Sequence, residues 1–243
     1  MRHLELARPA GRARLERVPT GWSVDLDLGP GADDAVGLLE AAVAEVAGHG
    51  GGTLRLWARA GDATTEAAGQ ALGLVRERDL HQLRRPLPVA EPAELEVRPF
   101  IVGQDEPAWL AVNNRAFDWH PEQGGWSLED LEARVEEPWF DPAGFLLHER
   151  DGALVGFCWT KEHRDVDPAL GEIYVIAVDP AAGVRGLGRP LTIAGLDHLH
   201  RQGIGVGMLY VDGGNASGLR LYEDLGFEVH HTDTSHTIEV PAS

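Results

Sequence analysis

The sequence predicts an α/β fold in which helices flank a mixed sheet, and three observations support this class. Residues 172–178 form an apolar, β-branched run with the length and composition of a buried strand. A glycine-rich turn, 183–190, leads from this strand into the apolar-periodic segment Leu191 to His200. A second strand, 207–212, is followed by Asn215 as a candidate N-cap and by a helix that ends at Gly226.

The elements before this stretch can also be predicted in order. Residues 95–100 form a first strand, and 106–117 form a helix with Trp109, Leu110, Val112 and Phe117 as its core positions. A second helix, 128–135, follows Ser127 as its N-cap. Residues 144–148 and 153–161 then pair as a hairpin, because the intervening Asp-Gly pair is a strong turn signal. A polar loop, 164–169, leads to the central strand.

The chain contains an internal repeat, because its second half matches its first when shifted back by 153 positions without a gap. Met208-Leu209-Tyr210 then matches Arg55-Leu56-Trp57, and Leu225-Gly226-Phe227 matches Leu72-Gly73-Leu74. The helix 191–200 matches 38–47, where Leu38, Leu39, Val43 and Val46 recur at helical spacing. The two halves therefore read as two copies of one strand-turn-helix unit.

The two copies differ at the positions where chemistry is expected. The shift places Arg185-Gly186-Leu187-Gly188 on Ala32-Asp33-Asp34-Ala35, Val175 to Val178 on Trp22 to Asp25, Glu172 on Pro19, and Tyr222 on Gly69. Met1 matches Leu154, so the first copy is expected to be incomplete. We interpret residues 1–83 as a degenerate, truncated domain, 84–94 as an extended linker with regularly spaced prolines, and 95–243 as the catalytic domain.

Composition excludes several classes of partner. The chain has 243 residues and a net charge of −18, which argues against nucleic acid or an anionic membrane as its main partner. The same charge suits a cationic small molecule such as an amine. Cys158 is the only cysteine and lies in an apparent strand, so we expect a buried thiol and a cytoplasmic protein. The histidines show no spacing that indicates a metal site.

These motifs resemble the acetyl-CoA-binding core of the tandem GCN5-related N-acetyltransferases (GNAT fold), and the mycothiol synthase family among them. The similarity covers residues 96–231 and includes Gly171 to Pro180, Arg185 to His200 and Arg220 to Phe227. One position departs from the superfamily pattern. Gly183 stands where a Gln or Arg is usual, so a side chain near the cofactor phosphates is missing, while the backbone amides of the turn remain.

The resemblance implies that acetyl-CoA binds along the central strand and the glycine-rich turn. Backbone groups of the strand would pair with the pantetheine arm, as if the cofactor added a strand. The N–H groups at the start of the helix would bind the diphosphate. The residues implied are Ile176, Ala177, Val178, Val184, Arg185, Gly186, Leu187, Gly188, Arg189, Asn215 and Arg220.

The resemblance also implies the catalytic groups. Glu172, at the mouth of the central strand, would be the general base that deprotonates the amine, and position alone would leave it a solvated strand-end carboxylate. Tyr222 would be the general acid for the thiolate of CoA, because a phenol with a pKa near ~10 suits that proton transfer. The alternative for Tyr222 is a core tyrosine that packs its helix on the sheet.

The expected function is acetyl-CoA-dependent acetylation of a primary amine. The family resemblance indicates the cysteinyl amine of a glucosaminyl-inositol, with Lys161, Glu172, Tyr210 and Glu122 as acceptor contacts. Structural roles remain open for Lys161, as a surface lysine, and for Tyr210, as a core residue. Two other functions also remain open, namely acetylation of another small amine and acyl-CoA binding without catalysis.

Overall fold

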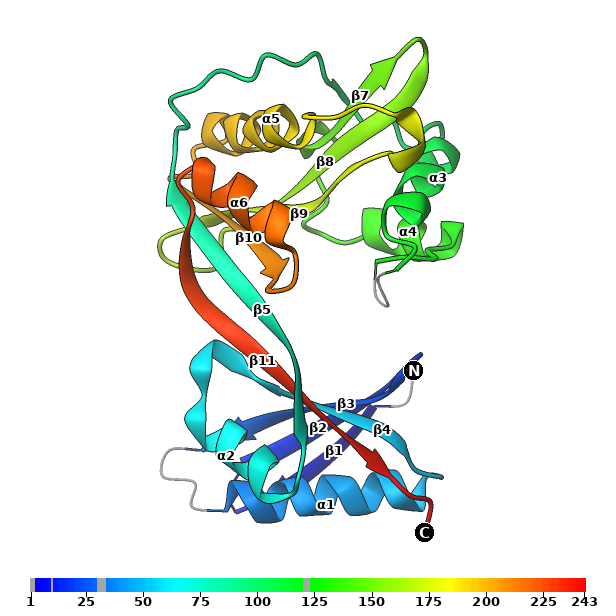
Figure 1. Ribbon diagram of the computed structural model, residues 1–243, viewed down its shortest axis with the longest axis vertical. Helices are drawn as coiled ribbons and strands as arrows, with labels where there is room; N and C mark the ends of the chain where they lie inside the picture. The colour runs from blue at the N-terminus through cyan, green and yellow to red at the C-terminus, as the bar shows by residue number, and fades with distance from the viewer. Residues whose placement is uncertain (1–2, 10, 30–33, 120–122) are drawn as a thin grey trace. The chain divides into compact units, whose positions relative to one another are not determined.

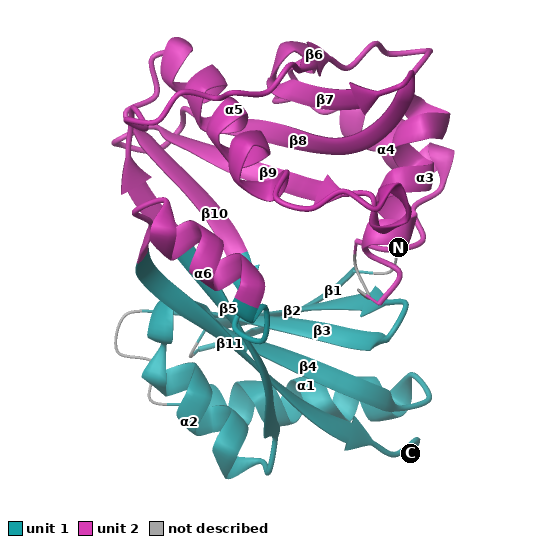
Figure 2. Ribbon diagram, turned by 45° about the horizontal axis from the view of Figure 1, so that its top comes forward, with its two compact units in different colours: residues 1–82, 211–216, 229–243 teal, residues 83–210, 217–228 magenta. Residues whose placement is uncertain are grey.

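The computed structural model describes residues 3–9, 11–29, 34–119 and 123–243 (Figure 1). Its helices and strands form two compact units (Figure 2). Unit 1 comprises residues 1–82, 211–216 and 229–243, and unit 2 comprises residues 83–210 and 217–228. In the described part of the chain, no helix combines the length and apolar character needed to cross a membrane.

Unit 1 is a sheet whose hydrophobic face is covered by two helices. Its strands lie in the order β1-β2-β3-β4-β11-β5. The first three strands are antiparallel neighbours, whereas β3 and β4 are parallel and connected through α1. Leu15, Leu38, Leu54 and Leu56 are fully buried in its core. The elements are β1 (His3–Arg8), β2 (Gly11–Val18), β3 (Gly21–Leu28), α1 (Ala35–Gly48), β4 (Gly52–Ala58), α2 (Ala63–Ala71), β5 (Val75–Pro86) and β11 (Glu228–Val240).

Unit 2 is a mixed sheet in the strand order β10-β9-β8-β7-β6. The strands β6 to β9 are antiparallel neighbours, and β10 pairs parallel to β9 after the crossover through α5. The elements are β6 (Arg98–Pro99), α3 (Glu106–Ala116), α4 (Leu128–Val135), β7 (Phe145–Arg150), β8 (Ala153–His163), β9 (Leu170–Val178), α5 (Gly188–Arg201), β10 (Val206–Asp212) and α6 (Ala216–Asp224).

The two faces of this sheet pack against different helices because successive strand side chains point to opposite faces. On one face, the rings of Phe145 and Trp159 stack with centroids 4.3 Å apart, and Trp109 of α3 packs edge-on against both. On the other face, Cys158 lies beside Gly195 of α5, so closely that a Cβ there would meet its sulfur at 2.5 Å. Cys158 is fully buried, as predicted, and burial raises the pKa of its thiol to about 12.

Most of the predicted elements of unit 2 are confirmed. The helix α4 has the predicted bounds, and Ser127 begins it in a capping box with Asp130. Asp151 and Gly152 connect β7 to β8 with φ of 52° and 74°, as an Asp-Gly hairpin turn requires. The expected first strand is shorter than predicted, since only Arg98 and Pro99 pair with β7. The first residues of the predicted linker, 84–86, instead continue β5.

The internal repeat is confirmed by the helices. The helices α1 and α5 have the same length and coincide under the shift of 153 residues, and so do α2 and α6. The strand part of the match is wrong by four residues. In unit 1 Ser23 pairs with Arg55, whereas in unit 2 it is Glu172 that pairs with Met208, the counterpart of Arg55. Glu172 therefore corresponds to Ser23 and not to Pro19. The offset of four arises because β9 runs one residue further beyond Glu172 than β3 does beyond Ser23, and because the connection from β9 to α5 is three residues longer than that from β3 to α1.

The C-terminal strand does not follow the predicted domain boundaries, which place residues 1–83 in one domain and 95–243 in the other. From Val229 onward, β11 belongs to unit 1, where it pairs antiparallel with β4 from Thr234↔Ala58 to Val240↔Gly52. Conversely, Leu83 to Pro86 at the end of β5 belong to unit 2. The alternating pattern of a strand indicates that the strand pairs, but it does not identify the partner strand. The sequence prediction therefore placed β5 and β11 in the halves of the chain in which they occur.

Candidate active site

The central strand β9 opens away from its neighbour β10. Their parallel pairing runs from Leu170↔Val206 to Ile173↔Leu209 and then ends, although β9 continues to Val178. On its other side, β9 stays paired with β8 up to Val178↔Gly156. Among the described strands, only β8 pairs with the predicted cofactor residues Ile176, Ala177 and Val178. One edge of their backbone is therefore available to another extended chain.

A β-bulge at Tyr174 changes which residues of β9 face each helix. Trp159 pairs with Val175 and Thr160 with Ile173, so Tyr174 is the extra residue. Ile173, before the bulge, approaches Gly195 of α5, whereas Val175, after it, lies in the aromatic core on the α3 face. A bulge bends its strand and redirects the side chains around it. The bulge thus lies where the pairing with β10 ends.

The predicted phosphate turn leaves the start of α5 uncapped. Gly183 and Gly186 adopt left-handed φ values of 63° and 80°, and a Cβ at either would meet open space. Leu187 is the N-cap residue but has no side chain that can accept a hydrogen bond. Within the described chain, no recorded hydrogen bond involves the backbone N–H groups of 184–189. These donors and the helix dipole form a potential anion site.

The three arginines near the turn differ in their partners. Arg189 forms an ion pair with Glu91, with Nη2 2.5 Å and Nε 3.1 Å from Oε2, so its side chain is already engaged. Arg185 and Arg220 are exposed, and neither has an ion pair within the described residues. Asn215 directly precedes α6, as predicted for its cap. The cofactor roles of these residues remain predictions.

An ion pair between the exposed Arg115 and the buried Asp179 anchors the connection between β9 and the turn. Asp179 is 6% exposed and accepts two hydrogen bonds from Arg115 of α3, at 3.0 Å from Nε and 2.7 Å from Nη2. It also accepts from the backbone N–H of Ala181 at 2.9 Å, and so caps the turn that follows β9. The guanidinium of Arg115 lowers the pKa of the Asp179 carboxyl. This pair could not be predicted from local sequence patterns, because its members are 64 residues apart.

Glu172 lies in a cluster of polar and aromatic side chains beside the bulge. Its side chain is 10% exposed, and its Oε2 lies 2.7 Å from Nε2 of His163. Lys161 stands opposite Glu172 in the β8–β9 pairing, with its Nζ 4.4 Å from the ring centroid of Trp139 and 5.6 Å from that of Tyr174. Burial raises the pKa of Tyr174, and the charge of Glu172 adds to this effect. The structure thus brings together two predicted residues, Lys161 and Glu172, with three that the sequence reasoning missed.

Tyr222, the predicted acid, is a buried residue of α6. It is 8% exposed, and its ring packs edge-on against Phe227 with centroids 5.8 Å apart. Burial raises the pKa of its phenol to about 12, above the ordinary value used in the sequence argument. In unit 1 the corresponding residue is Gly69, where a Cβ would meet Leu56 at 3.1 Å. A side chain at this position of unit 1 would therefore require Leu56 to shift.

The two remaining acceptor predictions have different outcomes. Tyr210 is 40% exposed and follows the last β9-paired residue of β10, so it is not the core residue that the sequence left as an alternative. Glu122 lies outside the described residues. Among the described residues, no group of three or more His, Cys, Asp or Glu side chains is arranged to hold a metal ion.

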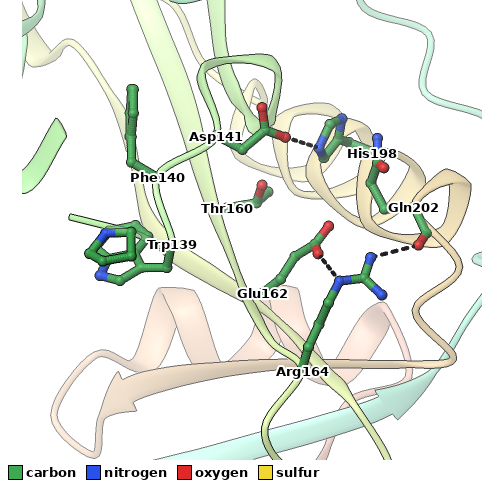
Figure 3. A pocket seen from close by; sticks show the side chains of 9 residues that line it. Trp139, Phe140, Asp141, Thr160, Glu162, Arg164, His198 and Gln202 are labelled. Carbon is green, nitrogen blue, oxygen red and sulfur yellow. Dashed lines mark hydrogen bonds and ion pairs between the residues drawn. The ribbon is translucent and has the colours of Figure 1, made fainter. Parts of the chain in front are cut away.

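A pocket of about 440 Å³, which is lined in part by Trp139 of the Glu172 cluster, lies at the C-terminal end of α5 (Figure 3). His198 and Gln202 of α5 line it together with Thr160, Glu162 and Arg164 from the end of β8. His198 lies 3.4 Å from Asp141, and burial lowers the pKa of its imidazole. His198 is ten residues beyond Gly188, which is roughly 15 Å along a helix. The pocket is therefore distinct from the anion site at the start of α5.

Comparison with known proteins agrees with this architecture. The profile of the acetyltransferase (GNAT) family matches residues 112–227. A GCN5-related N-acetyltransferase from Sphaerobacter thermophilus superimposes with a TM-score of 0.78 at 22% identity, over 96% of this chain and 78% of that one. A tandem GNAT protein from the clavulanic acid biosynthesis pathway gives a TM-score of 0.68 at 18% identity, over 96% and 80%. These structures establish the fold as that of the GNAT acetyltransferases.

Curated sequences give a narrower assignment. The mycothiol acetyltransferase of Thermomonospora curvata is 52% identical over 78% of this chain and 65% of its own length. That of Thermobispora bispora is 50% identical over 79% and 66%, and that of Acidimicrobium ferrooxidans 49% over 85% and 69%. The chain thus spans about two thirds of the length of these relatives. It belongs to the acetyltransferase (GNAT) family and, within it, to the mycothiol acetyltransferases.

Proposed function

We propose that this protein is an enzyme that transfers an acetyl group from acetyl-CoA to the cysteinyl amine of a glucosaminyl-inositol, which completes mycothiol. The observation that carries the proposal is the position of Glu172. A nearly buried carboxylate lies two residues before the bulge at which β9 loses its β10 partner. A cofactor that paired with residues 176–178 would extend along the same strand from which this carboxylate projects.

Cofactor binding is attributed to the open strand edge and to the start of α5. The chain has a net charge of −18, so an anion as highly charged as CoA needs a local attraction that outweighs the overall repulsion. The unpaired N–H groups of 184–189 and the positive end of the helix dipole supply that attraction. The exposed Arg185 and Arg220 add positive charge, whereas the side chain of Arg189 has to leave Glu91 before it can contribute.

The acceptor amine is proposed to bind beside the cluster around Glu172. Glu172 removes a proton from the acceptor ammonium, which restores the nucleophilic lone pair of the amine. Lys161 and Tyr210 offer donors for hydroxyl groups of a sugar, and the Trp139 ring forms an apolar wall under Lys161. A substrate that carries a cationic amine also matches the acidity of the chain.

We assign Tyr222 to stabilisation of the leaving thiolate of CoA, and the raised pKa of its phenol refines this role. At a pKa of about 12 its phenol stays protonated throughout the neutral range, so the proton is always present. A thiol has an ordinary pKa of about 8.5, so full proton transfer from this phenol is uphill. Tyr222 therefore serves first as a hydrogen-bond donor that stabilises charge on the departing sulfur.

A thiol-release assay tests the proposal directly. The protein is mixed with acetyl-CoA and with a panel of amines that includes the cysteinyl glucosaminyl-inositol, and free CoA thiol is measured against time. We expect the largest kcat/KM for that acceptor. A larger value for another amine would assign a different acceptor. Binding of acetyl-CoA by calorimetry without release of thiol for any amine would instead identify an acyl-CoA-binding protein. We also expect the protein to be cytoplasmic, because its one cysteine is a buried free thiol.

A further inference from the structure

The side chain of Glu172 is paired with that of His163, and the proposed role of Glu172 as a base does not by itself explain this pairing. Nε2 of His163 lies 2.7 Å from Oε2 of Glu172, which is the distance of a strong, charge-assisted hydrogen bond. His163 lies at the end of β8, two residues beyond Lys161, and pairs with Leu170 at the start of β9. Both side chains thus project from regular strands next to one another, which is a rigid basis for holding one carboxylate rotamer.

The stoichiometry of amine acetylation requires an exit for a proton. An ammonium acceptor carries three hydrogens on nitrogen. One remains on the amide after the C–N bond forms and the C–S bond breaks, and one is taken up by the departing sulfur. The third must leave the active site in every turnover. A buried carboxylate that accepts this proton has to pass it on before it can act again.

We propose that His163 is a positioning residue that holds Glu172 in its reactive orientation and passes the released proton from Glu172 to solvent. This inference rests on the proposed acetyltransferase function. The side chain of His163 is 26% exposed, whereas that of Glu172 is 10% exposed, so the imidazole connects the carboxylate to water. Its Nε2 faces Glu172, which leaves Nδ1 as the second nitrogen for the outgoing transfer.

The transfer depends on the tautomer of the imidazole. While Glu172 is a carboxylate, Nε2–H of the imidazole can donate to it. Once the carboxyl holds the amine proton, the tautomer protonated at Nδ1 accepts that proton at Nε2 and releases the one on Nδ1 to water. The other charged groups facing this cluster are Lys161 on β8, Arg134 at the end of α4, and Glu137 beyond it, while Tyr174 faces it from β9. Lys161 cannot replace His163 as the exit, because an ammonium near neutral pH has no free site for a proton.

The test uses two substitutions at position 163 in the full chain. His163→Gln retains an N–H that can donate to Glu172 but cannot carry a proton, whereas His163→Ala removes both capacities. We expect kcat of His163→Gln to fall by about 10- to 100-fold with KM for the amine within about twofold. We also expect the pH profile of kcat/KM to change, because glutamine cannot take up or release the proton that histidine passes on. Added imidazole should restore part of the rate of His163→Ala and none of that of Glu172→Gln.

The controls separate this inference from the function on which it rests. His200→Gln changes an exposed histidine in the last turn of α5, and we expect wild-type kcat and pH profile. Calorimetry with acetyl-CoA shows whether the variants at 163 are folded and bind. Wild-type kcat and an unchanged pH profile in His163→Gln would overturn the inference alone. A wild-type protein that binds acetyl-CoA but acetylates no amine would overturn the proposed function and the inference with it.

Discussion

The N-termini of α1 and α5 are corresponding sites in the two copies of the repeat, and they are capped in opposite ways. Asp34 and Leu187 are the two N-cap residues, 153 positions apart. Asp34 accepts a hydrogen bond from the backbone N–H of Gly37 at 2.9 Å, whereas Leu187 provides no acceptor and lies between two glycines. An acidic cap stabilises a helix and uses its anion site. The α5 end forgoes about 1 kcal/mol of capping and keeps its donors for a ligand.

The central strands of the two copies show the same contrast. Glu172 of β9 corresponds to Ser23 of β3, as their pairing with Met208 and Arg55 shows. The connection from β3 to α1 is also three residues shorter than that from β9 to α5. Unit 1 therefore retains the strand and helices of the repeat without its carboxylate, its long turn or its buried tyrosine. Unit 1 thus keeps only the scaffold of the repeated motif, whereas the predicted catalytic residues lie in unit 2.

The largest expected effect comes from removing the carboxylate that only one copy has. Glu172→Gln keeps the shape and hydrogen-bonding capacity of the side chain but cannot accept the amine proton. We expect kcat to fall by about 10²- to 10⁴-fold, as measured by thiol release. Ser23→Ala, the matched change in unit 1, should leave kcat within about twofold of wild type. Equal effects of the two substitutions would contradict the contrast between the copies.

The next test introduces a charge at the uncapped helix end. Gly186 has a φ of 80°, and a Cβ there meets open space, so Asn and Asp should fit with similar backbone strain. Asp adds a negative charge beside the expected diphosphate. We expect calorimetry to show an acetyl-CoA Kd about 10- to 100-fold higher for Gly186→Asp than for Gly186→Asn. Indistinguishable Kd values would place the phosphates elsewhere.

A smaller effect is expected on the ion pair that anchors the turn. Arg115→Gln leaves Asp179 buried without its cation, and we expect a loss of about 1–2 kcal/mol in unfolding free energy at pH 7. Because Arg115 lowers the pKa of Asp179, the stabilisation is complete above the ordinary carboxyl pKa of about 3.9 and is lost as pH falls through the lowered value. Urea midpoints of the two proteins should therefore converge in acid.

A control distinguishes this pair from surface charge in general. Arg12→Gln breaks the pair with Glu5, whose side chains are 65% and 50% exposed. Such exposed pairs contribute little, so we expect a change of no more than about 0.5 kcal/mol. A loss as large as that for Arg115→Gln would mean that burial of Asp179 is not what makes its pair important.

An effect at the lower end of that expected for Arg115→Gln is predicted at the capped helix end. Asp34→Ala removes the side-chain acceptor of α1 and should lower the unfolding free energy by about 1 kcal/mol, measured by urea denaturation. The Kd for acetyl-CoA should not change. A measurable change in that Kd would show that the α1 end also takes part in binding and would remove the distinction between the copies.

Local structure could be predicted from this sequence because local signals were strong. The capping box at Ser127, the Asp-Gly turn at 151–152 and the left-handed Gly226 each depend on neighbouring residues alone. Three other features depend on how the strands pair, namely the partner of β11, the bulge at Tyr174 and the contact between His163 and Glu172. Matching the two halves of the sequence without gaps does not reveal strand pairing. His163 could have been found, since alternation on β8 places it on the same face as Lys161.

The pairing of β11 with β4 has a consequence for synthesis on the ribosome. Residues 229–240 of β11 lie between β4 and β5 in the sheet, and they are translated some 170 residues after β4, which ends at Ala58. Until then, the backbone edge of β4 lacks that partner, and an exposed edge readily pairs with other chains. Chaperone demand during translation, and aggregation of stalled nascent chains, should therefore depend on the interval before residue 240 emerges from the exit tunnel.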